Sequence, residues 1–262
     1  MEQSNRFLPQ ASRNARFLEC LASDYARMRT VAEATGLGAK VPTCPEWTLA
    51  DLVQHVAQVY LHKAECMRLG RHPENWPPDL SGEPPLESLD RGYRDLVAEF
   101  AARPAESTTY TWYQPDQTVG FWIRRMAQET VIHRVDAELA AGVEVAPIPE
   151  DLAVDGVDEV LVAFLEYGVS GWPEEFTETL GSTSGARVRL DAGETAFLVE
   201  MAPATLKVSR VEVGAPADAA VSGGASEVLR WLWNRAGDEV VKRDGDENAL
   251  GVLRRSMVIA TQ

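Results

Sequence analysis

Apolar residues recur every three or four positions through most of the first half of the chain, which is the spacing of helices with one buried face. The predicted helices span residues 12–34, 48–69, 86–102 and 121–139. Gly36 and Gly38 end the first helix, and Thr48 with Asp51 three positions later has the pattern of a capping box. Four helices joined by two long loops predict a helical bundle over residues 1–148.

The pattern changes beyond residue 150, where polar and apolar residues alternate. After a helix over residues 151–167, three segments bounded by Gly, Pro and Asp predict strands of a half-exposed antiparallel sheet: ARVRLDAG, TAFLVEMA and TLKVSRVEVG. Two further helices and one strand are predicted in SEVLRWLWNRA, ENALGVLRRSMV and EVVKRD. The sequence therefore predicts an α+β protein of two domains, whose smaller second domain spans residues 149–262 and packs an antiparallel sheet on helices.

The 262 residues carry a formal net charge of -15, which restricts the choice of partners. Phosphate backbones and anionic membranes attract clustered Lys and Arg, so we expect neither nucleic acid nor membrane as a partner. The three cysteines cannot all pair and form no Cys-x-x-Cys motif, no secretory leader begins the chain, and no apolar run is long enough to span a bilayer. We therefore expect a cytoplasmic protein, either a monomer or a homodimer.

Glu129 and His133 carry the first candidate chemistry. They are four residues apart on the fourth predicted helix, so their side chains lie one turn apart on one face and can bind one metal ion. A third ligand must come from another element, and His55 on the second helix is our candidate. A histidine on an apolar helical stripe is more often a hydrogen-bonded core residue. However, His55 follows a rigid, proline-bounded connector, and bundle metal sites are assembled from inward side chains of facing helices.

Arginines near the proposed ligands are candidates for binding a substrate carboxylate. Arg124, Arg125 and Arg134 flank the ligands on the fourth helix. At least two of them must face solvent or acidic residues, and any one that faces the site could hold a carboxylate. We take Arg134 as a candidate catalytic residue, together with Arg235 on a helix of the second domain.

Other reactive side chains have simpler interpretations. Asp136, three residues after the second histidine ligand, either orients that ligand or forms a surface salt bridge. His62 and Cys66 are expected to pack on the helix and its surface, and His72 to be solvated in a loop. Cys44 either has a lowered pKa near a helix start or is a small residue that helps the connector to pack.

Two stretches containing these residues resemble one family. VPTCPEWTLADLVQH resembles the pattern VPTCPGWTVxDLxxH, and RRMAQETVIHRVDAE resembles RxMAHETxxHRxDAE, both of the mycothiol-dependent maleylpyruvate isomerase family. The resemblance implies a DinB-like four-helix bundle followed by a sterol-carrier-like C-terminal domain. It places the family's divalent-metal ligands on His55, Glu129 and His133. Glu46 and Gln128 replace the family's usual Gly and His. Both replacements leave the metal ligands intact but affect the shape of the pocket, and therefore which substrate it is expected to bind.

The resemblance also implies an activity. Zinc, the expected metal, would stabilise the thiolate of mycothiol, a low-molecular-weight thiol co-substrate. The thiolate adds to an electron-poor double bond, the bond rotates, and elimination returns the trans isomer, so cis–trans isomerisation of a maleylpyruvate-like electrophile is the leading prediction. Mycothiol S-transfer and thiol-assisted lyase chemistry are alternatives at the same site.

A hypothesis of another class is a non-catalytic protein that binds a small molecule and holds a structural metal. Structural zinc sites usually close with four protein ligands, whereas catalytic sites keep a position open. The sequence offers three convergent ligands, with Cys66 a poor fourth, and this favours the enzyme.

Overall fold

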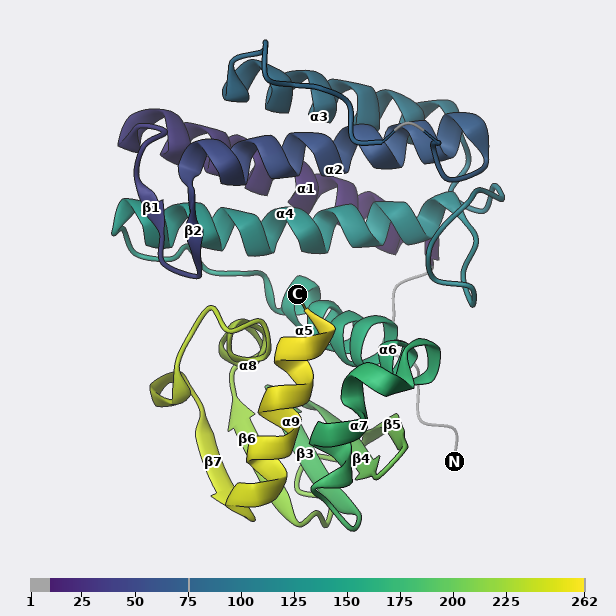
Figure 1. Ribbon diagram of the computed structural model, residues 1–262, viewed down its shortest axis with the longest axis vertical. Helices are drawn as coiled ribbons and strands as arrows, with labels where there is room; N and C mark the ends of the chain where they lie inside the picture. Colours follow the sequence, from purple (N-terminus) through teal and green to yellow (C-terminus); the bar gives the residue numbers. More distant parts are fainter. Residues whose placement is uncertain (1–9, 75, 262) are drawn as a thin grey trace. The chain divides into compact units, whose positions relative to one another are not determined.

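The structure is a computed structural model that describes residues 10–74 and 76–261. The chain divides into two compact units, residues 1–146 and 147–262, which lie toward the purple and the yellow ends of the colour scale in Figure 1. The first unit is helical, and the second combines a sheet with helices. The prediction of a two-domain α+β protein is therefore confirmed.

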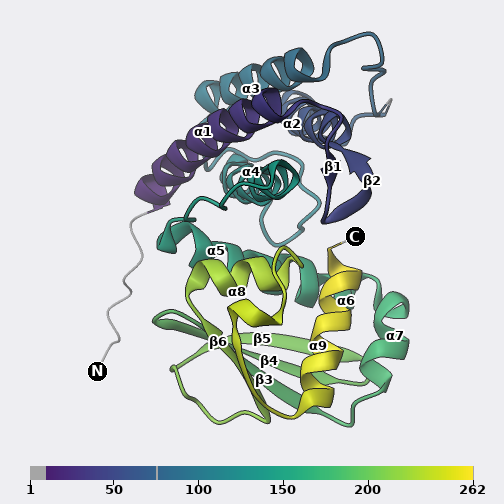
Figure 2. The ribbon, with the colours of Figure 1, turned by 90° about the vertical axis from the view of Figure 1, so that its left-hand side faces the viewer.

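Four long helices build the first unit, and each lies where the apolar spacing predicts it. They are α1 (Gln10–Thr35), α2 (Leu49–Leu69), α3 (Pro85–Ala102) and α4 (Val119–Ala141). α2 packs against α3 and α4, and α1 packs against α4, as Figures 1 and 2 show from two directions. α4 is thus in contact with two of the other three helices.

Caps fix the ends of α2 and α4. At the start of α2, Thr48 Oγ1 accepts a hydrogen bond from the Asp51 amide, and the Asp51 carboxylate accepts one from the Thr48 amide at 2.8 Å. This is the predicted capping box. Gly70 and Gly142 follow α2 and α4 in the left-handed conformation, with φ of 64° and 65°, a region that glycine enters without strain.

The connector before α2 forms a small antiparallel hairpin of β1 (Lys40–Val41) and β2 (Cys44–Thr48). Its prolines, Pro42 and Pro45, exclude helix as predicted, yet they leave enough donors and acceptors for the two short strands to pair. β2 runs directly into α2. The hairpin therefore has a fixed position relative to the first turn of α2.

α4 is buried along most of its length, including several polar residues. These are Arg125, Gln128, Arg134, Asp136 and Glu138. Burial of a charge is costly unless the charge is paired and hydrogen-bonded. The polar residues of α4 must therefore find partners within the protein, and their contacts locate the candidate site below.

The second unit contains a five-stranded sheet in the order β5-β4-β3-β6-β7. The strands are β3 (Ala186–Ala192), β4 (Thr195–Ala202), β5 (Thr205–Val211), β6 (Ala219–Gly223) and β7 (Lys242–Gly245). β3, β4 and β5 pair antiparallel as predicted, but the prediction of a wholly antiparallel sheet is wrong at β6, which pairs with β3 in parallel. After β5 the chain crosses to the far side of β3, and the short segment AAVSG has too little alternation to reveal this strand.

Helices accompany the sheet of the second unit. They are α5 (Glu150–Glu159), the π-helix η1 (Val160–Glu166), α6 (Tyr167–Gly171), α7 (Pro173–Gly181), α8 (Ala225–Leu232), the 3-10 helix η2 (Asp238–Val240) and α9 (Glu247–Ala260). The stretch from α5 through η1 covers the helix predicted over residues 151–167, whereas α7 is not evident in the sequence pattern. α8 and α9 are the two remaining predicted helices, and both pack against β3 and β6. The core of this unit therefore lies between these helices and the sheet.

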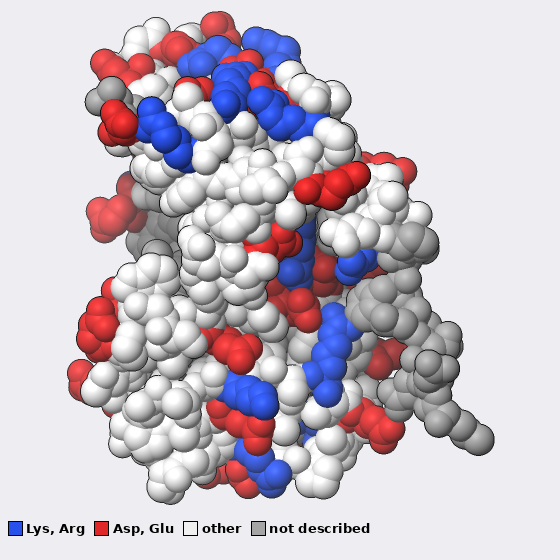
Figure 3. Space-filling model, turned by 90° about the vertical axis from the view of Figure 1, so that its right-hand side faces the viewer, with Lys and Arg blue, Asp and Glu red and all other residues white. Residues whose placement is uncertain are grey.

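The surface drawn in Figure 3 shows Lys and Arg lying among Asp and Glu. Ion pairs such as Arg91 with Glu83 and Arg71 with Glu74, each at 2.8 Å, are typical of the exposed charges. Within the described residues, no helix has both the length and the apolar character needed to cross a membrane.

Replacement of Thr48 by Ala is expected to lower the free energy of unfolding by about 1 kcal/mol, because it removes the hydroxyl that accepts a hydrogen bond from the Asp51 amide. Chemical denaturation followed by circular dichroism measures this loss. Thr48→Ser is the matched control, since it keeps the hydroxyl and is expected to stay close to the wild type. An equal loss in both variants would contradict a role for the cap.

Candidate metal centre

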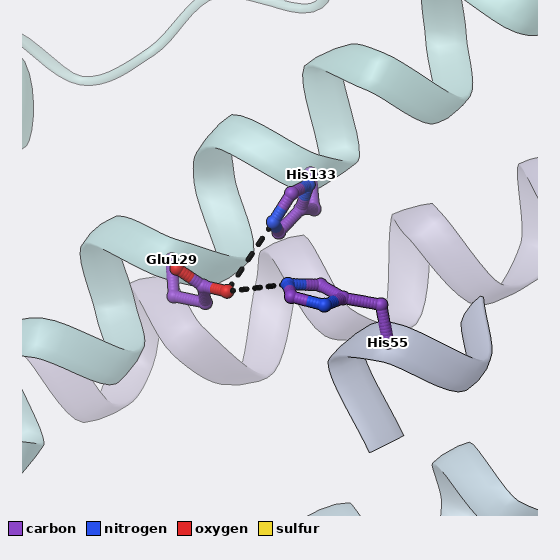
Figure 4. A group of neighbouring side chains, drawn as sticks. All are labelled: His55, Glu129 and His133. Atoms are coloured by element: carbon purple, nitrogen blue, oxygen red, sulfur yellow. Dashed lines mark hydrogen bonds and ion pairs between the residues drawn. The ribbon is translucent and has the colours of Figure 1, made fainter. Parts of the chain in front are cut away.

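His55 from α2 and Glu129 and His133 from α4 point toward one another (Figure 4). Their ligand atoms all lie within 4.8 Å of one another. Glu129 Oε1 is 3.3 Å from His55 Nε2 and 3.2 Å from His133 Nε2. In the part of the chain that the structure describes, no other group of three or more His, Cys, Asp or Glu side chains converges in this way. The structure thus brings together the three ligands predicted from the sequence.

Two of the three distances between these ligand atoms match the spacing expected in a tetrahedral zinc site. Bonds of about 2.0 to 2.1 Å from zinc to nitrogen and oxygen place neighbouring ligand atoms about 3.3 Å apart. Both separations from Glu129 Oε1 agree with this edge length. Two imidazoles and one carboxylate are also a donor set that zinc accepts in catalytic sites. The residues present therefore fit the metal that the sequence predicts.

A buried hydrogen bond fixes α2 against α4 close to the cluster. Tyr60 Oη and Thr130 Oγ1 are 2.6 Å apart, and both residues are fully buried. Tyr60 lies five residues after His55, and Thr130 directly follows Glu129. The contact therefore sets the register in which the ligands of the two helices meet.

The second nitrogen of His133 is held by a buried carboxylate. His133 Nδ1 lies 2.9 Å from Asp136 Oδ2, and Asp136 Oδ1 accepts a hydrogen bond of 2.5 Å from Thr43 Oγ1 at the hairpin turn. Asp136 has no exposed surface, so of the two roles predicted for it the surface salt bridge is excluded. When Nδ1–H donates to Asp136, the lone pair of neutral His133 is on Nε2, the atom that faces Glu129.

Arg125, on α4, reaches the cluster. Its guanidinium donates to Glu129 Oε2 at 2.7 Å, and its side chain is 4% exposed. Glu129 therefore has one oxygen paired with an arginine and presents the other, Oε1, to both histidines. This arrangement favours binding of a metal ion through one carboxylate oxygen.

The charges of the cluster shift the pKa values of its members. Burial alone raises the pKa of the Glu129 carboxyl, but His133, His55 and Arg125 together hold it well below its ordinary value. Burial lowers the pKa of His133, but the carboxylates of Glu129 and Asp136 outweigh burial and raise it to about 9. Without a metal, the cluster therefore holds an ionised carboxylate beside an imidazolium.

Arg134 lies in a separate buried network. It donates to Asp24 Oδ1 at 3.1 Å, to Glu138 Oε2 at 2.7 Å and to the Ala146 carbonyl at 2.8 Å, and its side chain is 1% exposed. Arg27 pairs with the same Glu138. These contacts give Arg134 a structural role, and its predicted contact with substrate stays a prediction.

Arg235 belongs to the second unit, where its guanidinium donates to the Trp233 carbonyl at 2.7 Å and lies beside the Trp233 ring. Its role in catalysis likewise stays a prediction.

The hairpin contributes a residue that sequence reasoning does not assign to the site. The ring of Trp47, on β2, lies 4.9 Å from the ring of His55 and 6.5 Å from that of His133. Trp47 and Thr43 both fall in the stretch VPTCPEW, so the resemblance of this stretch to the family pattern is the signal that could have identified them.

Two family models match the chain in sequence. Residues 18–138 match the Mycothiol maleylpyruvate isomerase N-terminal domain, and residues 151–251 match the MDMPI C-terminal domain. A comparison with curated proteins finds no match. The two matched domains follow one another and cover most of the chain.

Solved structures share the fold. A crystal structure of the mycothiol-dependent maleylpyruvate isomerase is 18% identical and superposes with a TM-score of 0.59 over 90% of this chain and 93% of that chain. A histidine-to-alanine mutant of the mycothiol-dependent maleylpyruvate isomerase is 16% identical, with a TM-score of 0.56 and the same coverage. With both family domains present in sequence and the fold shared over 90% of its length, the chain belongs to the mycothiol-dependent maleylpyruvate isomerase family.

Proposed function

We propose that the chain is a metal- and thiol-dependent enzyme that binds zinc at His55, Glu129 and His133 and uses mycothiol as its co-substrate. Its leading reaction is the cis–trans isomerisation of a maleylpyruvate-like acid. The observation that carries the proposal is the cluster of three convergent donors in a chain of this family. Such a set leaves a coordination position for a further ligand.

Bound zinc would supply the ionisation of a thiol near neutral pH, because the cation stabilises thiolate over thiol. The side chains around it prepare the site for that role. Arg125 keeps Glu129 ionised and orients its carboxylate so that Oε1 faces the two histidines. Asp136 holds His133 in the tautomer whose Nε2 lone pair can bind the metal. Trp47 covers the imidazole of His55 on the hairpin side.

The proposed isomerisation consumes no thiol, and the product has the same atoms as the substrate. The thiol sulfur adds to one carbon of the double bond, rotation about the resulting single bond follows, and elimination restores both the double bond and the thiol. If the electrophile carries a leaving group instead, the same attack gives an S-transferase, which is the nearest alternative. A thiol-assisted lyase is a further variant of the same chemistry.

The alternative of another class is a non-catalytic binding protein with a structural metal. No fourth protein donor joins the cluster among the described residues, and Cys66 lies with His62, at 3.7 Å, rather than with the three ligands. A structural zinc ion usually has four protein ligands. The donor count therefore supports the enzyme over the structural site.

Titration of zinc and then mycothiol into metal-free protein tests the proposal. We expect one equivalent of zinc to bind the wild type, mycothiol to bind the zinc-loaded form, and His133→Ala to weaken zinc binding at least 100-fold by removing one of three ligands. Calorimetry measures all three. Equal mycothiol binding with and without zinc, or unchanged zinc binding by the variant, would favour the binding-protein alternative.

The affinity for zinc is expected to increase with pH. His133, whose pKa is about 9 without metal, is protonated at neutral pH and must lose its proton to bind zinc through Nε2. The apparent affinity should therefore rise by up to roughly tenfold per pH unit below about 9, with close to one proton released per zinc. Calorimetry in two buffers of different ionisation enthalpy counts these protons. A pH-independent affinity between pH 6 and 8 would refute the assignment.

Asp136→Asn is expected to weaken zinc binding roughly 10- to 100-fold, since it removes the charge that holds His133 Nδ1–H. It should also reduce proton release, because the pKa of His133 falls without that carboxylate. Thr43→Val is the matched control, as it removes one hydrogen bond to Asp136 but leaves the carboxylate in place. Equal losses in the two variants would mean that Asp136 acts only through packing.

A further inference from the structure

Lys63 on α2 is a half-buried lysine without an acidic partner. Its Nζ donates to His62 Nδ1 at 3.0 Å and lies 4.9 Å from the centre of the Trp122 ring. No Asp or Glu of the described residues lies within ion-pair distance of it. The other three lysines of the chain, Lys40, Lys207 and Lys242, are exposed. An unpaired cation in this environment is unusual in a chain of net charge -15.

The groups around the ammonium are held in place by contacts of their own. Trp122 is fully buried, and its Nε1 donates to the Tyr110 carbonyl at 2.9 Å. His62 Nε2 is 3.3 Å from His72 Nε2, and the His62 ring packs against Trp76. Because the Trp122 ring and the His62 imidazole are both held in place, the ammonium of Lys63 has a defined position. One hydrogen bond and one aromatic face leave at least one of its three N–H donors unused.

Among the described residues, no group in direct contact with the Lys63 ammonium carries a negative charge. Burial, with the charge of Lys63 and the neighbouring His72, lowers the pKa of His62 to about 3, so its imidazole is neutral. Burial also raises the pKa of the Cys66 thiol to about 11, so that side chain is neutral as well. The cost of burying the ammonium lowers the pKa of Lys63 itself. An anion brought by a ligand would offset this cost.

Lys63 lies along the same two helices as the metal cluster. It follows His55 by eight residues, and Trp122 precedes Glu129 by seven, so the site is about two turns from the cluster on both α2 and α4. Side chains of a helix lean toward its N-terminus, which brings the Lys63 ammonium back toward His55. Lys63 also feels the charges of Glu129 and Arg125. The two sites are therefore neighbours along both helices, about 10 to 12 Å apart along the helix axes, a separation that an extended molecule is needed to span.

Solvent reaches this face of α2. His55, Val59, His62 and Lys63, which follow one another along one side of the helix, are all partly exposed. A small solute therefore has access to this side of the helix.

Building on the proposed function, we propose that Lys63 binds a carboxylate of the electrophilic substrate while the electrophilic carbon lies at the metal cluster. Arg125, on the α4 turn between Trp122 and Glu129, is already paired with Glu129, so the charge that recognises the carboxylate is that of Lys63. The substrate class is then an extended acid, whose carboxylate is several bonds from the carbon that the thiol attacks. Neutral electrophiles lack the group that this ammonium recognises.

Succinate is a suitable probe, because it is an extended dicarboxylate with no double bond for a thiol to attack. We expect calorimetric titration to show binding to the wild type and a roughly 10- to 100-fold loss in Lys63→Met, which keeps the stem over Trp122 but removes the charge. Lys63→Arg should retain most of the affinity. Lys207→Met is the matched control, since it removes the same charge from an exposed position and should leave the affinity unchanged.

A second measurement needs no variant. With isotope-labelled lysine, succinate should shift the side-chain NMR signal of Lys63 and leave those of the three exposed lysines in place. Equal affinity of the wild type and Lys63→Met, or an unmoved Lys63 signal at saturation, would overturn the proposal.

Both titrations are made with metal-free and with zinc-loaded protein, and neither contains thiol, so this result is independent of thiol activation. Lys63-dependent succinate binding without zinc-dependent mycothiol binding would retain the carboxylate site and reject the proposed function. The reverse pattern would retain the function and reject the carboxylate site.

Discussion

The carboxylate of Glu129, largely buried between two helices, is the constraint on which the first unit depends. A carboxylate removed from water needs cations and hydrogen-bond donors around it. Here Arg125 pairs with one oxygen of Glu129, and His55 and His133 lie close to the other. Each of these groups then needs support of its own, which Asp136 provides for His133. The buried charges therefore involve the hairpin as well, because Thr43 on the hairpin turn donates a hydrogen bond to Asp136.

The buried charges of α4 are paired in two separate sets. Arg134 pairs with Asp24 and Glu138, both buried, and this set ties α4 to α1. The second set, around Glu129, faces α2 and has an imidazole from that helix as a member. Since consecutive residues of a helix point about 100° apart, the neighbours His133 and Arg134 belong to different sets. One helix therefore both anchors the bundle and presents the ligands.

The sequence predicts what depends on local spacing. The four helices, the capping box at Thr48 and the pair formed by Glu129 and His133 all follow from residues within a few positions of one another. His55 required an argument about facing helices, and the family pattern supported it. What the spacing could not tell was which arginine turns toward the ligands, because that depends on the partners of Arg134, Asp24 on α1 and Glu138 on α4. For the same reason the parallel pairing of β6 was missed, since it depends on where a crossover leads.

The charges also connect the metal to the acid proposed to bind at Lys63. A strongly acidic chain repels an acid, so recognition must come from local cations that no carboxylate of the protein already neutralises. Arg134 is neutralised by two acids, whereas Lys63 is not paired with any in the described part of the chain. A divalent ion at the cluster would add two positive charges, and the proton lost from His133 would remove one. The net gain of one positive charge close to Arg125 favours an acid in the metal-loaded form, and by linkage the bound acid favours the metal.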